Sequence, residues 1–176
     1  LVMQARLLYN FSEGLLHGYE EYADLAAKAF DYMFDKMQAE QGWYKSLGKA
    51  RSRRDAEHYQ PQLLNAYDNL FVVIAFAAYF RASQRAEVGA EALRLFGLIN
   101  ELCGEGNLAE RGIRALYRDE SADKKHESSG HEHWGGHYSG NVMLHYLEAV
   151  VNLEESGLGD DNKKMINELR SLFLKS

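Results

Sequence analysis

The most constraining feature of the sequence is an unbroken apolar stretch, Leu70–Phe80, within a segment that carries no helix breaker. Its side chains would cover every side of a helix rather than one stripe. A helix that is apolar on all sides has to be buried on all sides. We therefore predict an inner helix over residues 63–82, enclosed by other helices, with Pro61 at its start.

The rest of the sequence predicts further helices, some of them mostly apolar and others with a charged side. One proline in 176 residues is consistent with long helices that have few breakers. The helical spacing of apolar residues predicts five more helices, over residues 1 to between 14 and 18, 20–39, 86–103, 139–155 and 161–174. The third and fifth helices are the most apolar. The fourth carries Glu87, Glu91, Arg94 and Glu101, which we expect on a solvent face.

This alternation predicts three helical hairpins with an inner and an outer ring, in one all-α domain over residues 1–176. Short strands are expected in the connections, at Gln41–Leu47 and within Ile113–Arg118. A polar loop covers residues 120–136. The chain begins inside a helical pattern without a capping residue, so we expect that part of the fold precedes it.

Composition excludes several classes. The net charge is −6 and no Lys/Arg stripe dominates, so we expect no nucleic-acid partner. The sequence has no signal peptide and no apolar span of membrane length, so we expect no membrane partner. Cys103 is the single cysteine, which favours a reducing, cytoplasmic location. Aromatic residues make up 12% of the chain and can line a carbohydrate pocket.

Four segments together resemble the N-acylglucosamine 2-epimerase family, which includes cellobiose 2-epimerases and mannose isomerases. They are the Gln4–Ser12 segment with its Gln-x-Arg pattern, Gly42-Trp43-Tyr44, Tyr67–Phe71, and Asn141–Ala149 with its Asn-x-x-x-His-x-x-Glu-Ala pattern. The family's fold is an (α/α)6 toroid, or barrel, about twice this length, and the resemblance covers its front half.

The resemblance implies a sugar epimerase or isomerase that moves a proton next to the sugar carbonyl. Two histidines do most of this chemistry in the family, and both correspond to positions beyond Ser176. We therefore expect the chain alone to be inactive and to supply a substrate-binding wall. No cofactor is implied. Half a toroid would expose apolar helix edges, so we expect a homo-oligomer or association with the missing half.

The candidate site residues agree with helical geometry. Asn141, His145 and Glu148 lie at i, i+4 and i+7 and therefore share one face of the fifth helix. Polar groups in an apolar helix need partners, and the hydroxyls of a mono- or disaccharide could supply them. His145 is the accessory catalytic candidate. The candidate substrate-binding residues are Arg6, Trp43, Tyr67, Asn141, His145 and Glu148.

Three alternatives remain open from the sequence. A glycoside hydrolase or unsaturated glucuronyl hydrolase on the same toroid would need paired carboxylates, for which Asp68 and Glu148 are the candidates. A metal-binding module could use His126, His131, His133 and His137, although a plain polar loop is the simpler interpretation and we predict no metal. A non-catalytic sugar-binding or protein-binding role is the third.

Overall fold

The computed structural model describes residues 1–39, 42–45, 63–103, 116–118 and 140–158. The helices and strands in this part follow each other as α1 (Val2–Leu16), the 3-10 helix η1 (Glu20–Tyr22), α2 (Ala23–Tyr32), the π-helix η2 (Met33–Met37), β1 (Leu63–Asn65), α4 (Ala66–Ser83), α5 (Ala86–Cys103), β2 (Leu116–Arg118) and α7 (Gly140–Glu155).

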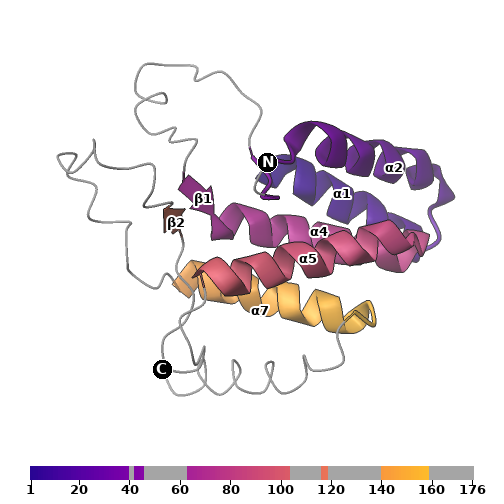
Figure 1. Ribbon diagram of the computed structural model, residues 1–176. Coiled ribbons are helices and arrows are strands. Elements are labelled where there is room, and N and C mark those ends of the chain that lie inside the picture. Colours follow the sequence, from indigo (N-terminus) through magenta and orange to yellow (C-terminus); the bar gives the residue numbers. More distant parts are fainter. Residues whose placement is uncertain (40–41, 46–62, 104–115, 119–139, 159–176) are drawn as a thin grey trace.

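Helix α4 lies at the centre of the described helices (Figure 1), and it packs against α1, α5 and α7. Every side chain from Asn69 to Tyr79 is buried, so the predicted inner helix is confirmed. Helix α1 pairs with α2 and α4 pairs with α5, which forms two helical hairpins. The helices α1, α4 and α7 make the inner layer, and α2 and α5 lie outside it.

The three inner helices run in the same direction. The guanidinium of Arg81, in the last turn of α4, is 3.6 Å from Glu13 near the end of α1 and 2.8 Å from Glu155 at the end of α7. The carboxyl ends of all three helices therefore meet at Arg81. Its positive charge is also favourable at the C-terminal end of the helix dipole.

The start of α4 differs from the expected one. The predicted helix begins at Leu63, but Leu63–Asn65 form strand β1, which pairs antiparallel with β2. Helix α4 starts at Ala66 because the side chain of Asn65 caps it by accepting a hydrogen bond from the backbone NH of Asp68, at 3.3 Å. The strand expected within Ile113–Arg118 is confirmed at Leu116–Arg118.

The second helix has its expected extent and a buried face that differs in part from the expected one. It runs from Glu20 through η1, α2 and η2 to Met37. The apolar residues of this segment predict a buried side made of Leu25, Ala29, Tyr32, Met33 and Met37. Met33 and Met37 are buried, but Leu25 and Tyr32 are exposed, and Ala26 and Phe30 are buried in addition. The ring of Phe30 lies 5.1 Å from that of Phe76 and 5.4 Å from that of Tyr79, so contact with α4 decides which face is buried.

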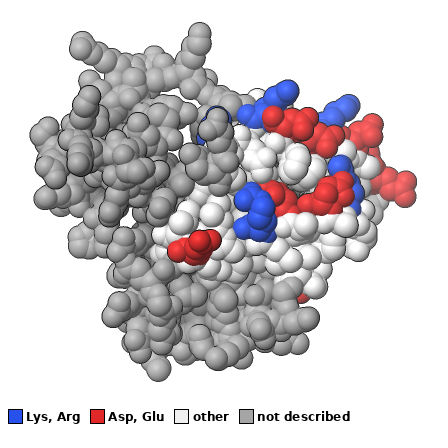
Figure 2. Space-filling model, in the orientation of Figure 1, with Lys and Arg blue, Asp and Glu red and all other residues white. Residues whose placement is uncertain are grey.

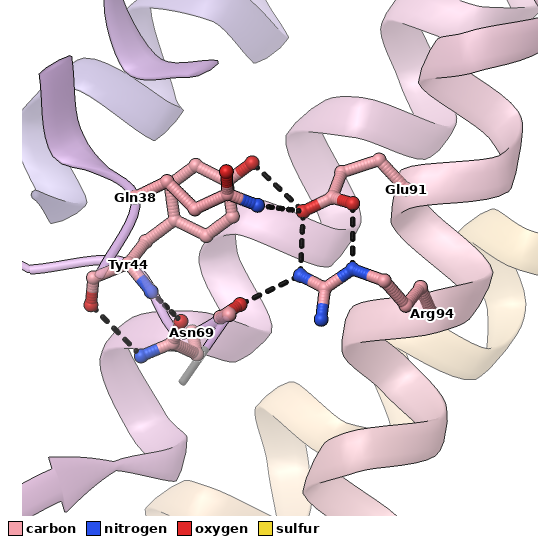
Figure 3. A network of polar contacts seen from close by, with 6 residues as sticks. Gln38, Tyr44, Asn69, Glu91 and Arg94 are labelled. Carbon is pink, nitrogen blue, oxygen red and sulfur yellow. Dashed lines mark hydrogen bonds and ion pairs between the residues drawn. The ribbon is translucent and has the colours of Figure 1, made fainter. Parts of the chain in front are cut away.

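A network of polar contacts joins the two hairpins (Figure 3). Glu91 of α5 accepts hydrogen bonds from the hydroxyl of Tyr44 at 2.9 Å and from Gln38 at 3.1 Å. Arg94 contacts the same carboxylate at 2.6 and 2.7 Å, and donates to the backbone oxygen of Gly42 at 2.6 Å. Glu91 is only 8% exposed, so its expected place on the solvent face is wrong. It is buried because three donors satisfy its charge.

Asn69 of α4 holds the same turn from the other side. Its side chain accepts from the backbone NH of Tyr44 at 2.8 Å and donates to the backbone oxygens of Tyr44 and Asn65 at 3.2 and 2.9 Å. Tyr44 lies within the strand-like segment expected at residues 41–47, and it forms an isolated antiparallel bridge with Gln38. The turn after η2 is thereby fixed against both α4 and α5.

Charged side chains of both signs lie next to each other over the face that carries α2 and α5 (Figure 2), and the described part of this face shows no continuous basic patch. In the same part of the chain, every helix is too short or too polar to cross a membrane. Several expectations lie outside the described residues, namely Pro61, the helix at 161–174, the loop at 120–136 and the histidines at 126, 131, 133 and 137.

Candidate functional site

The inner faces of α1, α4 and α7 line a partly open cavity of about 270 Å³. Each helix contributes residues spaced three or four apart, which is the spacing of one helix face. The lining residues are Ala5, Arg6, Tyr9 and Asn10 of α1, Phe71 and Ile74 of α4, and His145 and Glu148 of α7. A polar wall on α1 therefore faces a polar wall on α7 across an apolar floor on α4.

On α7, two predicted site residues form a pair. The Nδ1 atom of His145 is 2.8 Å from a carboxylate oxygen of Glu148, one turn later on the helix. A carboxylate only accepts hydrogen bonds, so the pair holds a proton on Nδ1. The second ring nitrogen, Nε2, is then left for a ligand, as an acceptor when the ring is neutral and as a donor when it is protonated. Sharing one helix face brings these residues together, as expected.

Aromatic rings support the imidazole of His145. The ring centroid of Phe71 is 4.3 Å away, and that of Tyr67 is 5.1 Å away in an edge-on arrangement. Tyr67 also packs edge-on against Phe71, at 5.2 Å. Tyr67 is not among the cavity-lining residues. Its described contacts instead fix the orientation of the histidine.

On α1, Arg6 is exposed and lies over the ring of Phe71, with 4.8 Å between its guanidinium carbon and the ring centroid. This cation–π contact orients the side chain and leaves its planar set of donors unused within the described residues. Arg6 and His145 therefore contact the same aromatic ring. The sequence-predicted residues Arg6, His145 and Glu148 come together at one cavity.

Two other predicted residues lie elsewhere. Asn141 is exposed on α7, one turn before His145, and does not line the cavity. Trp43 is 1% exposed within the hydrophobic core, and its indole nitrogen has no hydrogen-bond partner among the described residues. The structure thus places Trp43 in the packing between the hairpins and not at the cavity.

The cavity also contains residues that the sequence did not single out. Tyr9 and Asn10 lie three and four residues after Arg6, so helical spacing from Arg6 could have found them. Ile74 follows Phe71 by one turn in the same way. Asp68 is not a lining residue, and burial raises the pKa of its carboxyl group. Its pairing with Glu148, as a hydrolase would need, is therefore without support from this geometry.

Comparison with models of known protein families gives a match. The family model described as N-acylglucosamine 2-epimerase (GlcNAc 2-epimerase) matches residues 1–169. The chain belongs to the N-acylglucosamine 2-epimerase family. The family match covers all three inner helices and every residue that lines the cavity. A search of curated proteins finds no match.

Solved structures show the same fold as this member of the N-acylglucosamine 2-epimerase family. Cellobiose 2-epimerase from Spirochaeta thermophila matches with a TM-score of 0.75 and 21% identity, over 98% of this chain and 42% of that enzyme. The enzyme of the same name from Bacillus thermoamylovorans matches with a TM-score of 0.75 and 20% identity, over 98% and 43%.

A D-mannose isomerase matches with a TM-score of 0.67 and 18% identity, over 97% of this chain and 38% of the enzyme. The chain therefore spans about two fifths of the length of these solved relatives. The predicted α/α-toroid fold is confirmed, and the described hairpins form part of such a toroid.

Proposed function

We propose that this chain supplies one wall of the sugar-binding cavity of a sugar epimerase or aldose–ketose isomerase. The observation that carries the proposal is the convergence of Arg6 and the His145–Glu148 pair on one cavity between three inner helices. The family, and relatives that are cellobiose epimerases and a mannose isomerase, support a sugar as the ligand.

The chemistry of these groups suits a polyhydroxylated substrate. Arg6 can donate two parallel hydrogen bonds to neighbouring sugar oxygens. Epimerisation or isomerisation next to a carbonyl removes a proton from carbon and returns it. With Nδ1 directed to Glu148, the Nε2 atom of His145 can accept a hydrogen bond from a sugar hydroxyl when the ring is neutral, and can donate to the carbonyl oxygen and polarise it when the ring is protonated. Its role is accessory, because the resemblance assigns the main acid–base histidines to positions beyond this chain.

Sugar binding by the chain can be tested directly. Mannose, N-acetylmannosamine and cellobiose would be titrated while the NMR signals of the chain are recorded. We expect saturable shifts at the inner faces of α1 and α7, and weaker binding by Arg6→Ala and His145→Ala. His17→Ala is the matched control, because His17 is exposed at the end of α1 and does not line the cavity. Unchanged affinity in both cavity variants would contradict the proposal.

Turnover is a separate question. We expect none from this chain alone with the same three sugars, because the expected pair of catalytic histidines lies outside it. Clear conversion of any of them by the isolated chain would refute that part of the proposal and leave the binding wall in place.

The rival functions have less support. Among the described residues, no three His, Cys, Asp or Glu side chains are grouped so that they could hold a metal ion. The histidine-rich segment at 126–137 lies outside the described residues. A zinc titration by calorimetry would test that segment, and a saturable heat that His131→Ala and His133→Ala remove would revive the metal-binding alternative.

A further inference from the structure

The apolar floor of the cavity joins its two polar walls through one aromatic ring. The centroid of the Phe71 ring lies 4.8 Å from the guanidinium carbon of Arg6 and 4.3 Å from the centroid of the His145 imidazole. Arg6 belongs to α1 and His145 to α7, and α4, which carries Phe71, lies between these helices and packs against both (Figure 1). The Phe71 ring is therefore a common support for two binding groups from different helices.

The position of Phe71 is set by the core of the protein. Its side chain belongs to the stretch of α4 in which every side chain from Asn69 to Tyr79 is buried. The ring of Tyr67, one turn earlier, packs edge-on against the Phe71 ring at 5.2 Å. Side chains in such close-packed surroundings stay near one rotamer. Phe71 can therefore hold Arg6 and His145 without depending on either of them.

Arg6 depends on this support more than His145 does. The His145 imidazole also contacts the Glu148 carboxylate at 2.8 Å and the Tyr67 ring at 5.1 Å. Arg6 is exposed, and within the described residues Phe71 is the group that restrains its guanidinium. An arginine side chain has many rotamers, and a ligand that binds it has to restrict them at a cost in free energy. A guanidinium that is already held over a ring loses less freedom when a ligand arrives.

We propose that Phe71 is a positioning residue, whose ring holds the Arg6 guanidinium over the cavity and thereby strengthens the binding of a sugar. The inference rests on the proposed function, because the ligand is the same sugar. Phe71 also lines the cavity, so a direct contact between its ring and the sugar is the competing explanation. The two explanations differ in one respect. A positioning effect disappears when Arg6 is removed, whereas the effect of a direct contact remains.

A double-mutant cycle on Phe71 and Arg6 separates the two explanations. Mannose affinity would be measured by NMR titration for the wild type, Phe71→Leu, Arg6→Ala and the double variant. We expect Phe71→Leu to weaken mannose binding by about 3- to 10-fold, which corresponds to the loss of one partly desolvated cation–π contact. Added to Arg6→Ala, the same substitution should weaken binding by less than about 2-fold. An equal effect in both backgrounds would show a direct contact with the sugar and overturn the inference.

A second measurement needs no ligand. Nitrogen relaxation of the Arg6 Nε–H group reports the mobility of the side chain. We expect this group to be restrained in the wild type, mobile in Phe71→Leu, and restrained again in Phe71→Tyr, which keeps the ring. Phe76→Leu is the matched control, because Phe76 is also buried on α4, but its ring contacts those of Phe30 and Tyr44 and does not line the cavity. This control should leave both the mobility of Arg6 and the mannose affinity unchanged.

Three results would contradict these expectations, and each overturns a different claim. An Arg6 side chain that is equally mobile in the wild type and in Phe71→Leu, while the wild type binds mannose, would overturn this inference alone. Equal losses of restraint and affinity in Phe76→Leu and Phe71→Leu would assign the effect to general destabilisation and overturn the specific role of Phe71. No saturable sugar binding by the wild type would overturn the proposed function, and with it any role of Phe71 in sugar binding.

Discussion

At the scale of single residues, Glu91 shows how far the surroundings of a side chain can depart from its residue type. Its carboxylate is buried in a network with Gln38, Tyr44 and Arg94 (Figure 3). Glu101, on the same helix, is exposed. Residue type alone cannot distinguish Glu91 from Glu101, because two of the three residues that donate to Glu91, Gln38 and Tyr44, lie outside the hairpin of α4 and α5.

Glu91→Gln should therefore destabilise the chain, whereas Glu101→Gln should not. Glutamine keeps one acceptor but loses the paired contact with Arg94, so we expect a loss of about 1–2 kcal/mol in the free energy of unfolding. Urea denaturation of both variants checks this. Equal midpoints for Glu91→Gln and wild type would show that the network contributes nothing to stability.

We expect the folded chain to lose stability at alkaline pH, because two of its tyrosines are buried. Burial, followed by the nearby Glu91, raises the pKa of Tyr44, and burial raises that of Tyr146. In the unfolded chain both ionise near pH 10. The folded state therefore binds more protons above that pH, and its stability falls by about 1.4 kcal/mol per pH unit for each tyrosine. Urea unfolding between pH 9 and about 11 measures the slope.

Tyr44→Phe and Tyr146→Phe should each make that slope shallower, and the exposed Tyr19→Phe should leave it unchanged. The stability that the buried phenols contribute is fully present below about pH 10 and is lost as the pH rises. A slope equal to that of the wild type in both buried variants would contradict the assignment.

At the scale of elements, the start of α4 is set by one side chain. Asn65 ends β1 and caps α4 through its contact with the backbone NH of Asp68. Asn65→Ala should lower stability by about 1 kcal/mol, and Asn65→Asp should keep most of it, because aspartate caps equally well. Thermal unfolding followed by circular dichroism compares them. If the alanine and aspartate variants unfold at the same temperature, the cap does not contribute to stability.

At the scale of the whole molecule, Arg81 joins the ends of the three inner helices. Arg81→Gln should lower stability by about 1 kcal/mol, since the ion pairs are only partly buried. Salt screens such pairs, so the difference from wild type should shrink in 1 M NaCl. Urea unfolding at low and high salt measures it, with the exposed Lys28→Ala as a control. A difference that is unaffected by salt would point to lost packing instead.

The outer sides of the first and last described helices carry exposed apolar residues. Met3 on α1 is 69% exposed and Leu144 on α7 is 52% exposed. We expect these sides to associate, either with a second copy of the chain or with the rest of a toroid. Light scattering should show species larger than a monomer at high concentration, and the double variant Met3→Glu, Leu144→Glu should shift them towards monomer. A strictly monomeric wild type would count against association.

The sequence by itself determined the helical hairpins, the central place of α4 and the likeness to one family. It did so because helical spacing of apolar residues is local, and because a stretch as apolar as Leu70–Phe80 has no stable place except the interior. Helical spacing also brought His145 and Glu148 together, since both belong to one helix.

Only the tertiary structure decided what lies between helices. The burial of Glu91 and the core position of Trp43 depend on contacts between segments far apart in the chain. Spacing within one helix gives the relative direction of two side chains but not which neighbour they meet. The packing of α1, α4 and α7 decides which side chains meet, and it thereby decides the chemistry of the cavity.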